Sequence, residues 1–312
     1  MNTEIKNRSK LAIGIDIGGT RTKLGLVDLE KGEVLEMLIS PTETKDSDKF
    51  LEIINSGIDQ LKNVAQKGKS TILGVGFGVT GFVFDDGMVD STYGFLEFME
   101  DYPLSEYIQK YSSLPCRADN DARVVALGEA LYGIGKGQNR VLVLTLGTGL
   151  GLGFIANGKF ETSLPYAHMG GHISVGRTDF KCYCGKEGCL EALVSATGIV
   201  DSAKRLGWEQ KYPNLELNVQ TIFKAEQEGN EDAKQIVTEF LGYLKTGIDN
   251  YINLFAPGMI IIGGGVSKGM KPYLDKLTHI DFLPPYKRYK VKIALSELDE
   301  HSGILGSAAL FI

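Results

Sequence analysis

The stretch LAIGIDIGGTRTKLGLVD, residues 11–28, contains an apolar run that ends in an aspartate, a glycine-rich turn and a second apolar run. This pattern predicts two strands joined by a tight turn at Gly18-Gly19-Thr20. The pattern recurs at residues 140–156, RVLVLTLGTGLGLGFIA, where the turn is Gly147-Thr148-Gly149. Two copies of one unusual hairpin indicate two related lobes within one chain.

Helical spacing and buried-strand patterns alternate along the rest of the chain. The predicted helices cover residues 48–67, 104–111, 121–132, about 190–207, 218–228, 231–256 and 302–312, and further predicted strands cover residues 33–39, 71–79 and 259–262. A third glycine loop, Gly263-Gly264-Gly265, follows the last of these strands. This alternation places the chain in the α/β class.

The length, charge and composition of the chain exclude some classes of function. With 312 residues the chain is long enough for two domains, and its net charge of −6 argues against a general nucleic-acid binder. No apolar run reaches membrane-spanning length, and the first ten residues, MNTEIKNRSK, lack the apolar centre of a signal peptide. We therefore expect a cytoplasmic protein with no nucleic-acid or membrane partner.

The segment HISVGRTDFKCYCGKEGCLE, residues 172–191, brings together four soft or borderline metal ligands: His172, Cys182, Cys184 and Cys189. Their number and type suit tetrahedral Zn²⁺. A full set of protein ligands leaves no position for water, so the zinc is expected to be structural. A disulfide or simply packed thiols are the alternatives, and the absence of a secretory signal disfavours the disulfide.

The glycine turns are candidates for phosphate binding. Backbone N–H groups in such turns form concave anion sites, and Thr20 and Thr148 add hydroxyl donors. Asp16, just before the first turn, would hold a hydrated Mg²⁺. Tight hairpins without any ligand are the commoner outcome for glycine turns. Two turns of one pattern, with the loop at Gly264 and Gly265 as a third, favour phosphate binding.

Asn120 and Asp121 precede the predicted helix 121–132 and have two interpretations. An asparagine N-cap followed by an aspartate that complements the helix dipole needs no function. A carboxylate at this place is also what a general base requires. The local sequence alone slightly favours the cap.

Taken together, these motifs resemble the ROK family, which groups sugar kinases and sugar-responsive repressors. The resemblance rests on DIGGT (16–20), NDA (120–122), LGTG (146–149), GH (171–172), CYCGKEGCLE (182–191) and IGGGV (262–266). It implies a two-lobed actin/hexokinase-like, ribonuclease H-like ATPase fold with an inter-lobe cleft. The expected lobes are a small one, residues 1–119 plus 302–312, and a larger one with the zinc site, residues 120–301.

The resemblance also assigns roles. Asp121 would be the general base that takes a proton from a sugar hydroxyl as its oxygen attacks the γ-phosphate of ATP. The sugar-binding residues would be Gly81, Asn120, Asp121, His172 and Glu191. The residues that hold ATP and Mg²⁺ would be Asp16, Gly18, Gly19, Thr20, Thr148, Gly149, Gly264 and Gly265. Family habit suggests a homodimer or homotetramer.

Three positions depart from the family pattern, and all lie on the sugar side. Family kinases usually carry Glu where this chain has Met169, and a thioether accepts almost no hydrogen bonds. The usual Pro before the sugar-contacting glycine is Thr80, and the Asn often found in the next loop is missing from residues 91–98. The nucleotide loops are intact, so ATP binding is expected with a shifted sugar preference.

Four hypotheses follow for the function. An ATP-dependent kinase for a hexose or hexose derivative fits the phosphate loops and the base. A catalytically silent sugar or nucleotide sensor fits Met169. A sugar-responsive repressor of the same family would carry an N-terminal helix-turn-helix, so the short polar segment before the first strand and the acidic charge disfavour it. A ROK-type transcriptional regulator lacking its DNA-binding domain stays an alternative beside the sensor. A zinc oxidoreductase is disfavoured by the closed ligand set.

Overall fold

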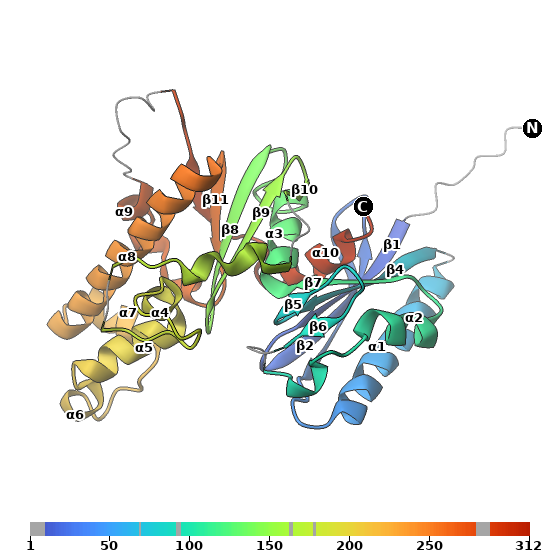
Figure 1. The fold of residues 1–312 in the computed structure, drawn as a ribbon, viewed down its shortest axis with the longest axis horizontal. Helices are drawn as coiled ribbons and strands as arrows, with labels where there is room; N and C mark the ends of the chain where they lie inside the picture. The colour runs from blue at the N-terminus through green and yellow to red at the C-terminus, as the bar shows by residue number, and fades with distance from the viewer. Residues whose placement is uncertain (1–9, 69, 92–94, 162–164, 177–178, 279–287) are drawn as a thin grey trace, which may run out of the picture. The chain divides into compact units, whose positions relative to one another are not determined.

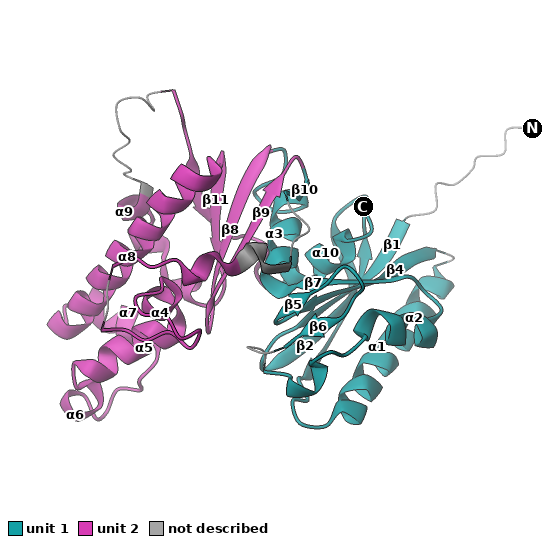
Figure 2. Cartoon of the chain, viewed as in Figure 1, with its two compact units in different colours: residues 1–137, 158–167, 300–312 teal, residues 138–157, 168–299 magenta. Residues whose placement is uncertain are grey.

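The computed structural model describes residues 10–68, 70–91, 95–161, 165–176, 179–278 and 288–312 (Figure 1). The chain divides into two compact units (Figure 2). Unit 1 comprises residues 1–137, 158–167 and 300–312, and unit 2 comprises residues 138–157 and 168–299.

Unit 1 is built on a mixed sheet with the strand order β3-β2-β1-β4-β7. Its strands are β1 Lys10–Ile17, β2 Arg21–Asp28, β3 Glu33–Pro41, β4 Thr71–Val79 and β7 Cys116–Asn120, with short strands β5 Phe82–Val83, β6 Val89–Asp90 and β10 Lys159–Phe160. Its helices are α1 Ser47–Lys67, η1 Glu97–Met99, α2 Leu104–Ser112, α3 Asp121–Leu131 and α10 Ser302–Ala309. The β1–β2–β3 meander is antiparallel, whereas β1, β4 and β7 run parallel.

Helix α10 lies directly on the sheet of unit 1 because the strands present glycines to it. A Cβ on Gly14 of β1 would lie 2.0 Å from the carbonyl oxygen of Ile304, and one on Gly76 of β4 would lie 1.9 Å from that of Ser307. No side chain fits in either place, so only glycine permits this approach. Strand residues that alternate with these glycines, such as Ile13 and Ile15, are fully buried in a cluster with residues of α1.

Unit 2 repeats the hairpin design in strands β9, β8, β11 and β12, which neighbour one another in this order within the second sheet. The strands are β8 Arg140–Leu146, β9 Leu150–Ala156, β11 Met259–Gly263 and β12 Lys292–Leu295. The helices are η2 Pro165–His172, α4 Glu191–Val194, α5 Ala196–Arg205, α6 Trp208–Lys211, α7 Val219–Gln227, α8 Glu231–Phe255, η3 Val266–Gly269, η4 Lys271–Tyr273 and α9 Leu274–Thr278, and η6 Asp299–His301 precedes α10.

The two predicted hairpins are confirmed as equivalent pieces of their sheets. In each unit the first strand of the hairpin pairs antiparallel with the second, β1 with β2 and β8 with β9. On its other side the same strand pairs parallel with a later strand, β4 or β11. Each turn therefore lies at the carboxyl end of a central strand.

The division into units differs from the expected lobes at residues 120–137, which contain α3, and at residues 158–167 and 300–301. The expected boundary put residues from 120 onward in the larger lobe, whereas α3 lies in unit 1. The reason is close packing against α10: a Cβ on Gly128 would lie 2.4 Å from the carbonyl oxygen of Ser302. In the described part of the chain, no helix is both long and apolar enough to span a membrane.

The packing of α10 makes Gly14→Ala a test of the fold. We expect this substitution to lower the free energy of unfolding by about 1–3 kcal/mol, because backbone atoms of α10 must move to admit the methyl group. Gly242→Ala in α8 is the control, since a Cβ there meets nothing within 4 Å. That change should raise stability by about 0.5–1 kcal/mol. Urea unfolding followed by circular dichroism measures both, and an unaffected Gly14→Ala protein would contradict the packing.

Candidate active site and metal centre

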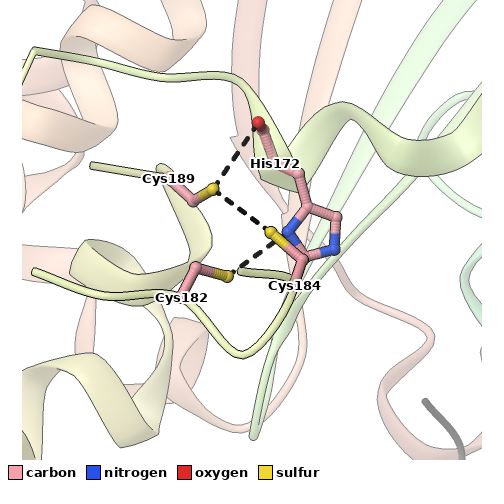
Figure 3. Close-up of side chains that lie close together, drawn as sticks. All are labelled: His172, Cys182, Cys184 and Cys189. Carbon is pink, nitrogen blue, oxygen red and sulfur yellow. Dashed lines mark hydrogen bonds between the residues drawn. The ribbon is translucent and has the colours of Figure 1, made fainter. Parts of the chain in front are cut away.

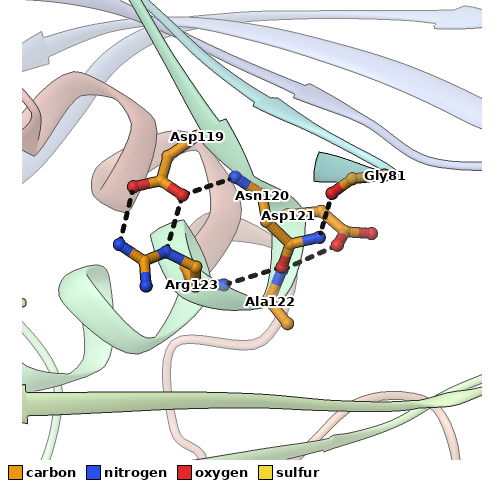
Figure 4. Close-up of polar contacts among 6 residues, drawn as sticks. All are labelled: Gly81, Asp119, Asn120, Asp121, Ala122 and Arg123. Carbon is orange, nitrogen blue, oxygen red and sulfur yellow. Dashed lines mark hydrogen bonds and ion pairs between the residues drawn. The ribbon is translucent and has the colours of Figure 1, made fainter. Parts of the chain in front are cut away.

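The junction between β7 and α3 is organised by the side chain of Asn120, which is only 5% exposed (Figure 4). Its Oδ1 accepts hydrogen bonds from the N–H groups of Ala122 at 3.0 Å and Arg123 at 3.3 Å, as an N-cap does. Its Nδ2 donates to the carbonyl oxygen of Gly81 at 3.0 Å. Asn120 therefore both begins α3 and ties it to the loop after β4.

Asp121 is the first residue of α3 and has a different environment for each carboxylate oxygen. Oδ1 accepts the N–H of Ala122 at 2.8 Å, and Oδ2 accepts the hydroxyl of Thr80 at 3.3 Å. Burial, and to a smaller extent the charge of Asp16, raise the pKa of Asp121 to about 6 against the opposing hydrogen bonds. A carboxylate with a raised pKa is a better proton acceptor than an ordinary surface aspartate.

Asp16 lies near the end of β1, beside the first glycine turn. Its Oδ2 is 3.6 Å from the Nζ of Lys23 on β2. Burial raises the pKa of Asp16, while the charge of Lys23 lowers it. The first residues of α10 approach the same carboxylate, since a Cβ on Gly303 would lie 2.5 Å from its Cγ. Lys23 was not singled out in the sequence, because its pairing depends on the β1–β2 register.

A second carboxylate at the junction is structural. Asp119 accepts the Nε of Arg123 at 2.7 Å, and the same Oδ1 accepts the N–H of Asn120 at 2.7 Å. The Arg123 side chain is buried, and its guanidinium lies 4.4 Å from the centre of the Phe160 ring. Asp119 is thus engaged in a partly buried ion pair with Arg123, so Asp121 is the better candidate for a general base.

The first glycine turn has the compact geometry expected of a hairpin. The N–H of Gly18 donates to the carbonyl oxygen of Arg21 at 3.1 Å, and the hydroxyl of Thr42 donates to the oxygen of Gly18 at 2.6 Å. Gly19 and Thr20 at the tip are exposed. The backbone of the tip is therefore open to solvent, as a phosphate-binding turn requires.

The second turn and the third loop lie together in unit 2. Gly147 donates its N–H to the carbonyl oxygen of Gly149 at 3.0 Å, and Thr148 is exposed. Gly264 has φ +85°, and a Cβ there would lie 2.4 Å from the oxygen of Leu146 at the end of β8. Gly265 is exposed beside it. The parallel pairing of β8 and β11 explains why both loops share one edge.

The four predicted metal ligands converge (Figure 3). The Sγ of Cys182 is 3.5 Å from the Nδ1 of His172, the Sγ atoms of Cys184 and Cys189 are 3.6 Å apart, and all four ligand atoms lie within 4.8 Å of one another. Zn–S bonds of about 2.3 Å imply ligand atoms roughly 3.8 Å apart. The cysteines are free in this structure, and all four ligand atoms surround one point rather than pairing off. The donor set fits a tetrahedral zinc ion.

The ring of His172 has two distinct sides. Nδ1 faces the sulfur atoms, and Nε2 is 3.3 Å from the hydroxyl of Tyr183. Burial lowers the pKa of His172, and the neutral imidazole is the form that binds metals. A metal on Nδ1 would place the ring proton on Nε2, which then donates on the side away from the metal.

Glu191 connects the metal-ligand loop to the second glycine turn. It is the first residue of α4 and only 7% exposed. Its Oε2 accepts the N–H of Leu150 at 3.0 Å, and a Cβ on Gly149 would lie 2.9 Å from the same oxygen. A predicted sugar-binding carboxylate is therefore fixed against a predicted phosphate loop within unit 2.

The two related units, each with a glycine hairpin at the centre of a mixed sheet, define a two-lobed protein of the actin/hexokinase-like kinase fold. A ROK family glucokinase from Streptomyces griseus, solved in complex with glucose and AMPPNP, superposes with a TM-score of 0.76 at 26% identity and covers 96% of this chain and 98% of its own. The chain belongs to the ROK family, whose family model matches residues 12–312.

Relatives of known sequence include both kinases and regulators. A glucokinase from Halalkalibacterium halodurans is 31% identical over 312 residues, which cover 96% of this chain and 94% of the relative. A xylose repressor from Caldicellulosiruptor bescii is 28% identical over 312 residues, which cover 96% of this chain and 77% of the repressor. Membership of the family therefore supports sugar phosphorylation in general and leaves the individual activity to be argued from the site.

Proposed function

We propose that this protein is an ATP-dependent kinase that phosphorylates a hydroxyl of a hexose or hexose derivative, with Asp121 as the general base. The observation that carries the proposal is the carboxylate of Asp121 at the start of α3. It has a raised pKa, and Asp16 of the first glycine hairpin lies close enough for its charge to contribute. A nearly full-length match to a glucokinase supports the same reaction class.

The proposed phosphoryl transfer needs one general base to take up the proton that the sugar hydroxyl releases. The oxygen of the sugar hydroxyl forms a bond to the γ-phosphorus while the bond from that phosphorus to the β–γ bridging oxygen breaks, and ADP leaves. The hydroxyl proton passes to the carboxylate of Asp121. Each oxygen of this carboxylate already accepts one hydrogen bond, Oδ1 from the N–H of Ala122 and Oδ2 from the hydroxyl of Thr80, and each keeps a lone pair that can take the proton.

The nucleotide is assigned to the glycine loops. Gly18, Gly19, Thr20, Thr148 and Gly149 would donate to phosphate oxygens, and Gly264 and Gly265 would lie by the nucleoside. Their exposure and tight backbone geometry support this assignment. Asp16 would hold a hydrated Mg²⁺, which neutralises phosphate charge during transfer. The AMPPNP complex of the related Streptomyces griseus glucokinase supports an adenine nucleotide as the phosphate donor.

The sugar is assigned to Gly81, Asn120, Asp121, His172 and Glu191. In this proposal a structural Zn²⁺ on the four ligands fixes the loop that carries His172 and precedes Glu191, and the Nε2–H of His172 donates to a sugar hydroxyl. Nδ1 faces the sulfur atoms and Nε2 points away from them, which supports that role. The sugar hydroxyl would take the place of the Tyr183 hydroxyl, which lies 3.3 Å from Nε2. The side chain of Asn120 caps α3 through Oδ1 and donates from Nδ2 to the oxygen of Gly81, so this residue would hold the sugar pocket in shape as well as face the sugar.

A sensor without catalysis is the second candidate, and Met169 favours it. Met169 lies in η2, which ends at His172, in a position where family kinases usually have a glutamate. A thioether cannot accept the sugar hydroxyls that a carboxylate would accept. A protein that binds ATP and sugar without turnover would match this alternative.

The zinc assignment gives the first prediction for this site. Purified protein should contain about one zinc per chain. Cys189→Ser should lose most of the metal and lower the midpoint of thermal unfolding, because a ligand and the closure of the loop are lost together. Cys116→Ser, which changes the remaining cysteine in unit 1, should keep the metal content. Elemental analysis decides, and a metal-free protein that is fully folded would overturn the site.

The base assignment is tested by an ATP-consumption screen across hexoses, N-acetylhexosamines and less common sugars. Asp121→Asn should reduce turnover of the best sugar by about 10²–10⁴-fold, while the fold is preserved. Asp48→Asn, an exposed aspartate in the first turn of α1, is the matched control. Retained activity in Asp121→Asn would exclude it as the base. No turnover with any sugar, together with calorimetric binding of ATP, would support the sensor.

The raised pKa of Asp121 predicts the pH dependence of catalysis. The base acts as a carboxylate, and its pKa of about 6 means that it becomes protonated as the pH falls below that value. The ratio kcat/KM should therefore level off above pH 7 and fall about tenfold per pH unit on the acid side. Initial rates from pH 5 to 8 measure this, and a profile flat down to pH 5 would contradict the raised pKa.

A further inference from the structure

Thr80 lies next to Asp121 because of how β4 and β7 pair. The two strands are parallel, and Val79 at the end of β4 is in register with Asn120 at the end of β7. The next residue on each strand, Thr80 and Asp121, therefore leave the sheet side by side. The link from Asn120 Nδ2 to the oxygen of Gly81 holds the two chain segments together at this edge.

The hydroxyl of Thr80 donates a hydrogen bond to Oδ2 of the Asp121 carboxylate. Its Oγ1 is 3.3 Å from Oδ2 of Asp121, whereas Oδ1 is engaged by the N–H of Ala122. An ionised carboxylate only accepts hydrogen bonds, so the threonine must be the donor in this contact. Its own oxygen lone pairs stay available to accept a further hydrogen bond.

We propose that Thr80 is a positioning residue for the base: its hydroxyl holds Oδ2 of Asp121 in direction and stabilises the ionised carboxylate. This inference rests on the proposed role of Asp121 as base. The threonine gives the reacting carboxylate a donor on Oδ2, the oxygen that the N–H of Ala122 does not engage.

Other charges around Asp121 do not replace this donor. Asp16 on β1 is a like charge, and it is itself paired with Lys23 on β2. Asp119 and Arg123 neutralise each other in their ion pair. The sequences of β4 and α10 contain no ionisable side chain.

The short strand β10 also packs against α3, and it adds one charged residue. This residue is Lys159, which is exposed. Burial raises the pKa of Asp121. The N–H of Ala122 and the hydroxyl of Thr80, with a smaller contribution from the side chain of Asn120, donate hydrogen bonds that lower it.

The test is Thr80→Val, which keeps the shape of the side chain and removes the hydroxyl, compared with Thr80→Ser, which restores it. Loss of a hydrogen bond to a charged group should move the acid limb of the kcat/KM profile upward by about 0.5–1 pH unit in Thr80→Val. Thr80→Ser should return it close to the original profile. Thr71→Val, at the exposed start of β4, should leave the profile unchanged.

A direct titration separates this inference from the proposed function. The ¹³C carboxyl signal of Asp121, identified as the aspartate signal missing in Asp121→Asn, should titrate at higher pH in Thr80→Val than in the unmodified protein. An unchanged titration in Thr80→Val would overturn the role of Thr80 even if the enzyme is active. A shifted titration in a protein that turns over no sugar would instead overturn the kinase assignment and keep the contact.

Discussion

Close packing of α10 on the sheet of unit 1 fixes the place of the candidate base. Gly14 and Gly76 admit the backbone of α10, and Gly303 at its start lies against Asp16. The same helix packs on α3, whose first residue is Asp121. Two carboxylates from distant parts of the sequence are held near each other by a helix that contributes no charge of its own. Packing elsewhere in the unit offsets the free-energy cost of burying two like charges near each other.

In unit 2 the candidate site residues are held by a metal-ligand loop instead of by a closely packed helix. Its candidate ligand residues follow one another along a short path: the four metal ligands close a loop, Glu191 begins α4 directly after that loop, and the carboxylate of Glu191 accepts the N–H of Leu150 at the second glycine turn. A metal in the loop would stiffen this path without touching either substrate. Glu191 is both a proposed sugar ligand and a hydrogen-bond partner of the second glycine turn. We infer that loss of the metal would disturb phosphate binding as well as sugar binding.

Short-range patterns in the sequence predicted several of the features that form the candidate site. The hairpins, the convergence of His172 with the cysteines and the cap at Asn120 depend on short-range spacing, and the structure confirms them. The sequence did not predict contacts set by strand register, such as Lys23 with Asp16 or Thr80 with Asp121. It also did not predict which nitrogen of His172 faces the sulfur atoms. The placement of α3 differed because the contact between Gly128 and Ser302 spans 174 residues of sequence.

Two departures from the family pattern act on different parts of the chemistry. Met169 takes away an acceptor for sugar hydroxyls, which bears on recognition. Thr80 adds a donor to the carboxylate of Asp121, which bears on proton transfer. In our proposal the Thr80 contact serves the carboxylate that accepts the proton. A kinase with a shifted sugar preference accounts for both residues, whereas a sensor without turnover accounts for Met169 alone.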